Sequence, residues 1–365
     1  MYAYEYIGLD VHKRTITYCG KLADGTVTGR GTINATRGDL ERWVAQRKVP
    51  WKGALEATLF SGWIYDFLRP HAVDLLVGHP AKLRAITTAK KKNDQADADT
   101  LADLLRCNLV PACHMAPPEI RELRRVLRYR NLLVQQIVRL KNRTAGFLME
   151  VGAAYNKQRL HSKKYFTELL ATVTDVPPSV VDLLRRNRTV LEMLETLQRQ
   201  LLAGLTRQPL LQERVKLLES IDGVGPVLAL TWALEVGQAK RFPSIGDAVS
   251  YCGLTSAQRN SAGKEQRGPI SKQRNAHLQW VLIEAAKMAP RRYPHLKRIY
   301  DRERERGHYN RATLMVARKL VAYLLAVDRS RQPFRSPDAE AKAEGPLRPA
   351  PASVGRLGTA VKALR

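Results

Sequence analysis

Four acidic residues in the first hundred positions have the types and spacing suited to metal-dependent phosphate chemistry. Asp10 ends the apolar string 7–9, Glu56 ends a second short apolar string, and Asp94 and Asp97 lie three residues apart. Residues at that spacing share one face of a helix. Mg²⁺ prefers oxygen ligands, and a pair of such ions about 3.5–4 Å apart can clamp both reacting oxygens of a phosphodiester. The pattern predicts a Mg²⁺ site, with Mn²⁺ as the alternative metal.

Plainer explanations for single members of this set stay open. An acid at a strand end often marks a turn, and acids near a helix N-terminus are favoured by the helix dipole. Asp99 and Asp103 lie on the same predicted helix but turn away from the other pair, so we interpret them as solvated. The run Lys90, Lys91 and Lys92 just before the acids could hold a phosphate backbone, or it could be an exposed charge run.

A second candidate for chemistry is a serine in the segment 251–275. Ser261 lies among small residues and several cations, and we interpret this segment as a Gly-rich loop. A serine there could attack phosphorus while the cations stabilise the developing charge. An ordinary flexible turn explains the same residues, and Ser256 is an alternative nucleophile. The cations predicted to contact nucleic acid are Lys264, Arg267, Lys272 and Arg274.

Two glycines between apolar helical segments form a third candidate. Gly223 and Gly225 flank Val224, and Pro226 suits the first turn of the following helix. This pattern predicts a helix-hairpin-helix, whose turn presents backbone N–H groups and a helix N-terminus to a phosphate. An ordinary turn between helices is the alternative.

The elements that must position these residues fall into four regions. Strands are expected at 4–10, 14–22, 26–33, 52–56 and 73–77, with helices at 37–47, 63–68 and 94–107, which indicates an α/β layer domain over 1–112. Long amphipathic helices are expected at 119–151 and 180–205, so 113–210 reads as a helical, coiled-coil linker. A mainly helical domain follows over 211–328, and 329–365 is expected to be a disordered basic tail.

Composition narrows the class of partner. The 365 residues carry a net charge of +27, and 44% are hydrophobic, which is an ordinary globular value. Residues 1–110 contribute only +4, so the excess lies in residues 111–365. A polyanion is the expected partner, whereas a membrane is not, because no apolar run is long enough to span one. Four cysteines without paired spacing and no visible secretory leader favour a cytoplasmic protein. With a nucleic-acid partner, we expect it to be associated with the bacterial nucleoid.

Taken together, these motifs resemble a known family. The chain resembles the IS110/IS116/IS902 transposases in the order and separation of four strings: 8–13, 92–98, 221–226, and 251–254 continuing to 270–272. The similarity extends over about residues 4–327. The acidic set resembles the RuvC-like branch of the RNase H fold. The resemblance implies a RuvC-like domain, a coiled-coil linker and a transposase domain with a nucleophilic serine. It implies metal binding by Asp10, Glu56, Asp94 and Asp97, and it places Ser261 at the nucleophile position, although Ala262 replaces a glycine of the family's string.

The resemblance also implies a mechanism and partners. Members of the family are bacterial recombinases guided by a bridge RNA, and they form dimers that assemble into tetramers on donor and target DNA. Our leading hypothesis is a recombinase that exchanges strands through a serine-linked intermediate. One alternative is a structure-specific endonuclease of the Holliday-junction type, which uses only the acids and water. The other is a non-catalytic nucleic-acid-binding protein.

Overall fold

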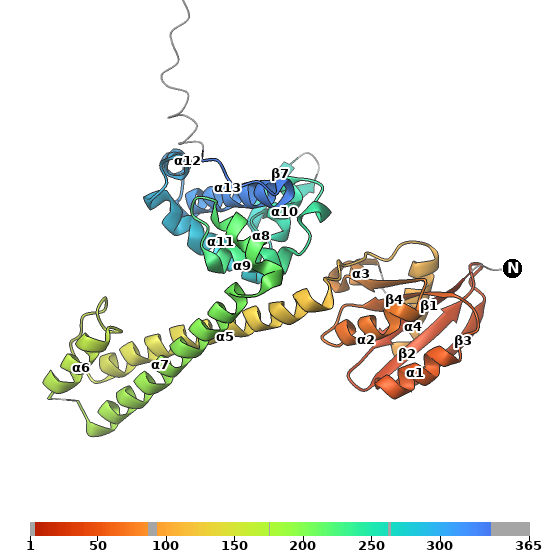
Figure 1. The fold of residues 1–365 in the computed structure, drawn as a ribbon, viewed down its shortest axis with the longest axis horizontal. Helices are drawn as coiled ribbons and strands as arrows, with labels where there is room; N and C mark the ends of the chain where they lie inside the picture. The colour runs from red at the N-terminus through yellow and green to blue at the C-terminus, as the bar shows by residue number, and fades with distance from the viewer. Residues whose placement is uncertain (1–3, 87–92, 175, 262–263, 337–365) are drawn as a thin grey trace, which may run out of the picture. The chain divides into compact units, whose positions relative to one another are not determined.

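The computed structural model describes residues 4–86, 93–174, 176–261 and 264–336, except for the side chains of 257–267. The chain divides into two compact units, Met1–Pro118 and Glu119–Arg365, which are described one at a time. Figure 1 colours them from red to yellow and from yellow to blue.

The first unit is built on a five-stranded sheet in the order β3-β2-β1-β4-β5. Strand β1 is antiparallel to β2 and parallel to β4, and β4 is parallel to β5. The predicted set of three antiparallel strands followed by alternating helices and strands is confirmed, while helix α3 was not predicted. The elements are β1 (Glu5–Val11), β2 (Thr15–Lys21), β3 (Val27–Asn34), α1 (Arg37–Ala45), β4 (Trp51–Glu56), α2 (Ser61–Leu68), η1 (Arg69–His71), β5 (Asp74–Gly78), α3 (Pro80–Ile86) and α4 (Asp94–Arg106).

Alternation along the strands divides the buried residues of the first unit between two faces of the sheet. Ile7, Leu9 and Val11 of β1 pack into a core with residues of α1 and α2. On the opposite face Cys19 packs with Ala98 and Ala102 of α4. Successive strand residues point to opposite faces, so Gly8 and Asp10 belong to the face that α4 covers.

The second unit is mainly helical. Its long helices α5 and α7 and the buried α9 agree with the predicted pattern, while α6 was not predicted. A large apolar core joins α8, α9, α11 and α13 around Trp232. The elements are α5 (Pro118–Glu150), α6 (Lys163–Thr172), α7 (Pro178–Thr206), α8 (Pro209–Glu219), α9 (Pro226–Val236), η2 (Ala239–Arg241), α10 (Ile245–Tyr251), β6 (Ser256–Ser261), β7 (Lys264–Ile270), α11 (Ala276–Met288), η3 (Ala289–Arg291), α12 (Pro294–Glu305) and α13 (Tyr309–Ser330).

Two expectations for the second unit are wrong. The segment expected to be a Gly-rich loop contains an antiparallel hairpin of β6 and β7. The tail expected from 329 starts too early, because α13 continues to Ser330 and Phe334 packs against Tyr323 with ring centroids 4.6 Å apart. Most of that predicted tail, 337–365, lies outside the described residues. Among the described residues, none of the helices combines the length and apolar character needed to cross a bilayer.

Candidate active site

The first two predicted acids come from neighbouring parallel strands. Leu9 of β1 pairs in register with Leu55 of β4, so Asp10 and Glu56 each follow a paired residue at the carboxyl edge of the sheet. Because both leucines lie in the core on the α1 and α2 side, alternation places both acids on the face that α4 covers. Strand register alone therefore brings Asp10 and Glu56 to one edge.

Helix α4 brings the other two acids by packing unusually close to β1. A Cβ atom built on Gly8 would lie 2.1 Å from the Ala98 carbonyl oxygen and 2.5 Å from the Ala102 nitrogen. Only glycine leaves room for the helix backbone at that point. Asn93 caps the helix by accepting a hydrogen bond from the Ala96 amide. Asp94 and Asp97 lie in the first turn, so this close packing brings them to the edge that carries Asp10.

Three side chains converge at this edge. Candidate ligand atoms of Asp10, His12 and Asp94 all lie within 4.8 Å of one another. His12 Nε2 lies 3.0 Å from Asp10 Oδ2 and 3.4 Å from Asp94 Oδ1. Asp10 is largely buried, whereas His12 and Asp94 are more than half exposed. The site is thus open to solvent on one side and has a buried carboxylate at its base.

The electrostatics of Asp10 favour a cation at this position. Burial raises the pKa of Asp10, and the negative charges of Asp94 and Asp97 raise it further, while His12 acts to lower it. A carboxylate in this setting is stabilised by a nearby positive charge. The donor set of carboxylates and one imidazole fits a divalent metal, and oxygen ligands predominate as Mg²⁺ and Mn²⁺ require.

The structure distributes the predicted acids unequally. Asp10 and Asp94 belong to the converging group, and Asp97 is close enough to influence the charge of Asp10. Glu56 lies at the same edge by register but is not a member of the converging group. His12 is the member that the sequence prediction missed. Its position two residues after Asp10 was the available signal, because that spacing returns an extended chain to the same face.

The interpretation of Asp99 and Asp103 as solvated residues is wrong. Asp99 accepts two hydrogen bonds from Arg30 of β3, and Lys21 Nζ lies 2.7 Å from Asp103 Oδ2. Partial burial acts to raise the pKa of Asp99, but its hydrogen bonds, led by those from Arg30, outweigh burial and lower it to about 2. These acids join α4 to β2 and β3 through ion pairs with cations of the neighbouring strands, which lie far from the acids in sequence.

Ser261 ends β6, and its backbone pairs with Lys264 at the start of β7. The base of this hairpin is well defined. The Ser271 amide donates to the Thr255 carbonyl over 3.0 Å, and Arg318 Nε donates to the Leu254 carbonyl over 2.8 Å. Gly253 has a φ of +69°, which glycine adopts without strain. The backbone of the serine hairpin therefore rises from a fixed base.

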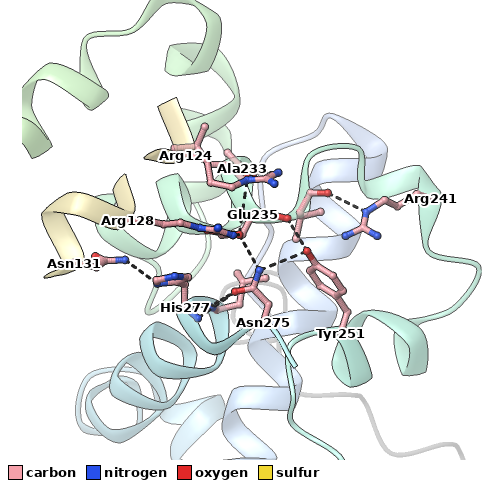
Figure 2. A network of polar contacts seen from close by, with 12 residues as sticks. Arg124, Arg128, Asn131, Ala233, Glu235, Arg241, Tyr251, Asn275 and His277 are labelled. Atoms are coloured by element: carbon pink, nitrogen blue, oxygen red, sulfur yellow. Dashed lines mark hydrogen bonds and ion pairs between the residues drawn. The ribbon is translucent and has the colours of Figure 1, made fainter. Parts of the chain in front are cut away.

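A buried polar network lies beside that base (Figure 2). Arg128 of α5 donates from two nitrogens to the Glu235 carboxylate, each over 2.8 Å, and Asn275 Nδ2 donates to the same carboxylate over 2.8 Å. Tyr251 donates to the Glu235 carbonyl over 2.9 Å. Asn275 also caps α11, directly after the serine segment. The network joins α5, α9, α10 and α11, and the sequence prediction contained none of it.

The negative charge of Glu235 is compensated by neighbouring side chains of the protein. Its side chain is fully buried. Burial acts to raise its pKa, but the hydrogen bonds and charge of Arg128, together with Asn275 and Arg124, outweigh burial and hold the pKa below its ordinary value. A buried carboxylate satisfied by bidentate arginine and amide donors is a structural feature. We therefore assign this network to positioning the hairpin base.

The remaining residues predicted to contact nucleic acid lie in different settings. Gly223 has a φ of +86°, whereas Gly225 caps α9 with a φ of −103° and has open space around a built Cβ. Lys272 and Arg274 are exposed. The side chains of Lys264 and Arg267 lie outside the described residues, as do Lys90, Lys91 and Lys92.

Comparison with known proteins supports the identification of this chain as a transposase. The DEDD transposase model of IS110 elements matches residues 7–152, and the model of the transposase IS116/IS110/IS902 family matches 215–301. Together the two models cover more than half of the chain. The chain belongs to the IS110 family of transposases, and it is a DNA transposase, as the resemblance of its motifs implied.

Individual relatives agree with this assignment at low identity. The chain is 26% identical over 273 residues to the transposase for insertion sequence element IS1328 of Yersinia enterocolitica, covering 70% of this chain and 78% of the relative. It is 27% identical over 258 residues to the transposase for insertion sequence element IS1111A of Coxiella burnetii, covering 67% and 68%. A candidate transposase of Sinorhizobium fredii, y4qE, is 24% identical over 290 residues, covering 78% and 72%.

Proposed function

We propose that this transposase exchanges DNA strands through a covalent phosphoserine intermediate on Ser261, assisted by divalent metal at the carboxyl edge of the first unit. The observation that carries the proposal is the convergence of Asp10, His12 and Asp94 within 4.8 Å, on a face where Glu56 and Asp97 also lie. A DEDD-type transposase is expected to depend on divalent metal, and Mg²⁺ is the ion we propose, with Mn²⁺ as a substitute.

The acids have distinct tasks in this proposal. Asp10, Asp94, Asp97 and Glu56 would hold the metal, and His12 would adjust the charge of Asp10 from its position 3.0 Å away. When bound, the metal would supply positive charge to polarise the phosphate. The buried position of Asp10 limits its movement, so it would fix the site relative to the sheet. The sheet order and the placement of the acids support a RuvC-like assignment for the first unit.

The serine step conserves the energy of the phosphodiester. The Ser261 hydroxyl oxygen would attack phosphorus, forming a serine–phosphate bond while the bond to one DNA oxygen breaks. The serine proton passes, in net terms, to the departing DNA hydroxyl. Attack by the hydroxyl of another strand reverses these changes and restores Ser261. No water is consumed, so strands are exchanged rather than hydrolysed.

The second unit would supply the nucleic-acid contacts. We propose that the turn at Gly223 and Gly225 acts as a helix-hairpin-helix, because the fold does not need a glycine at position 225 whereas a closely approaching phosphate would. The cations proposed to hold DNA at the serine hairpin are Lys264, Arg267, Lys272 and Arg274, with Lys90, Lys91 and Lys92 near the metal.

The proposal includes the domain organisation and partners that the family implies. We assign 1–112 to the metal-binding domain, 113–210 to the coiled-coil linker, 211–336 to the serine domain and 337–365 to a basic tail. The partners are donor and target DNA, a bridge RNA, and further copies of the chain that form dimers and tetramers. Sequencing RNA that copurifies with the protein tests the guide: a discrete species matching DNA beside the gene is expected, and random RNA contradicts it.

A suicide-substrate assay tests the serine step. DNA that loses its leaving strand after cleavage should trap a protein–DNA adduct with the wild-type protein. Ser261→Ala should abolish the adduct, whereas Ser256→Ala is the matched control in the same strand and should retain it. EDTA should also prevent its formation. An adduct that survives Ser261→Ala refutes the assignment, and free 5′-phosphate ends without an adduct would favour the endonuclease alternative.

A further inference from the structure

Two surface cavities of the second unit share one aromatic wall, the Trp280 side chain. The first has a volume of about 330 Å³ and is lined by the glycine turn, Arg130, Trp280 and Glu284. The second has a volume of about 480 Å³ and is lined by Ile270, Arg274, Trp280, Lys287 and Tyr309. Trp280 lies on α11 and is 41% exposed. A large aromatic ring is thus presented to solvent between two hollows.

The first cavity is lined in part by a buried cation, Arg130, which also lines a neighbouring cavity with Gln198 and Glu195. Arg130 is only 8% exposed. Its Nε donates to Gln198 and its Nη1 donates to Asn131, both over 3.2 Å, and both acceptors are neutral amides. Within the described part of the chain, no carboxylate forms an ion pair with it. A buried guanidinium is stabilised by an anion, so an anionic group of a ligand would complete this site.

The remaining walls suit a nucleobase and its backbone. The first cavity is mainly apolar, with Pro226, Val227 and Val281 beside Trp280. Gly225 opens onto the same cavity with space around its Cα, so a phosphate could approach the turn closely. The acidic residue at the rim, Glu284, is exposed and already paired with Lys287 over 2.7 Å.

The second cavity reaches the base of the serine hairpin. Ile270 is the last residue of β7 and pairs with Ser256 at that base, and the other end of the hairpin carries Ser261. Tyr309 offers a second exposed aromatic ring, while Arg274 provides positive charge. Exposed aromatic rings alternating with cations are the pattern by which proteins bind unpaired nucleic acid, with bases stacked on rings and phosphates on cations.

We propose that the two cavities form one track for an unpaired DNA strand, in which Trp280 stacks on a base and Arg130 holds a backbone phosphate. The occupant is DNA because the track leads to the hairpin of Ser261, where the proposed function cuts DNA; the inference rests on that function. The track would hold the strand that becomes unpaired beside the point of exchange.

Fluorescence and anisotropy with the full-length protein test the track. A labelled single-stranded DNA oligonucleotide should quench tryptophan emission and bind with an affinity that Trp280→Ala lowers by about 5- to 100-fold. Trp280→Phe should stay within about threefold of wild type, because phenylalanine retains a stacking face. The matched control is Tyr129→Ala, a more exposed aromatic next to Arg130 in sequence that lines neither cavity; the DNA affinity of this variant should not change.

The salt dependence of binding tests the phosphate contact. Arg130→Met should reduce the slope of log affinity against log salt by about 0.7, the value for one phosphate of a single strand. Arg186→Met, at an exposed arginine paired with Asp182, should leave the slope unchanged. If Arg130→Met does not fold by circular dichroism, Arg274→Gln, at an exposed position in the second cavity, provides the same measurement.

The outcomes separate this track from the proposed function. Unchanged single-stranded DNA affinity in Trp280→Ala refutes the track, even if Ser261→Ala still abolishes the adduct and supports the serine mechanism. An oligonucleotide of RNA that quenches Trp280 more strongly than DNA of the same sequence refutes the DNA assignment. The proposed function is refuted instead if the adduct survives Ser261→Ala while DNA affinity still depends on Trp280.

Discussion

Asp10 and Glu235 are both buried carboxylates, but their surroundings shift the pKa of the carboxyl group in opposite directions. Around Glu235, Arg128 and Asn275 donate three hydrogen bonds of 2.8 Å, and the pKa is held below its ordinary value. Around Asp10, burial raises the pKa and two further acids add to the effect, with the His12 imidazole opposing them.

This difference separates a structural carboxylate from a functional one. The charge of Glu235 is fully compensated by its own chain, so the network fixes helices and needs no ligand. The charge at Asp10 is not compensated to the same degree, and the group opens to solvent through Asp94. A site that gathers acids at a cost to stability is typical of ligand binding and catalysis. The contrast can be tested by removing each charge in turn.

Removing the Glu235 charge should have the largest effect on stability. In Glu235→Gln the Arg128 and Arg124 guanidinium groups lose their anion, and breaking a buried pair costs about 3–5 kcal/mol. Because Arg128 is half-exposed, we expect a value near the lower end, about 3 kcal/mol. Urea unfolding measures it, and Glu122→Gln, at an exposed ion pair with Arg125 on the same helix as Arg128, is the control and should cost less than about 0.5 kcal/mol. Equal effects of the two substitutions would show that burial of the network does not matter.

Displacing α4 should have an intermediate effect. In Gly8→Ala the new methyl group would meet the Ala98 carbonyl oxygen, so the helix that carries Asp94 and Asp97 must move away from β1. Such overpacking costs about 1–3 kcal/mol. Gly29→Ala is the matched control, since it lies in β3 with open space around its Cβ. Urea unfolding should show the loss of stability in Gly8→Ala alone, and strand cleavage should fall as well. Normal stability and cleavage in Gly8→Ala would mean that the close packing does not position the acids.

The sheet and the main helices of the first unit could be predicted because each carries a strong local signal. Apolar strings ending in Asp10 and Glu56 predicted two strands, which end at Val11 and Glu56, and the spacing of Asp94 and Asp97 predicted one helical face. His12 was missed because its role depends on the third dimension, where α4 brings Asp94 to it. The ion pair of Asp99 depends on the fold in the same way, since its partner Arg30 lies 69 residues away in the chain.

The second unit was less predictable because its key contacts join distant segments. Glu235 sits within an apolar helix pattern, and its partners Arg128 and Asn275 are separated from it by 107 and 40 residues. The strands β6 and β7 lack the apolar alternation that marks a half-buried strand. Polar strands of this kind are recognised only through their mutual pairing, so the sequence alone predicts a loop.

Removing the charge of Asp10 should have the smallest effect on stability, and it should stabilise the protein, whereas the other two substitutions destabilise it. Since burial raises the folded-state pKa of Asp10, the protonated form favours folding below the ordinary pKa, and this contribution is lost as pH rises through the raised value. In metal-free protein at neutral pH, the free energy of unfolding of Asp10→Asn should therefore equal that of wild type or exceed it by up to about 1 kcal/mol. Urea unfolding at several pH values measures the difference, which should grow in favour of the variant as pH rises above the ordinary carboxyl pKa.

Metal addition should then reverse the order of the two proteins. A ligand that binds only the folded state stabilises it by about 2.7 kcal/mol at a hundred times its dissociation constant. Mg²⁺ or Mn²⁺ should raise the melting temperature of wild type but not of Asp10→Asn, and only wild type should cleave a DNA strand. Asp39→Asn provides the control, because that acid pairs with Arg42 on α1, away from the site. If Asp10→Asn gained as much stability from metal as wild type, the carboxyl edge would not be the metal site, and the contrast with Glu235 would lose its functional meaning.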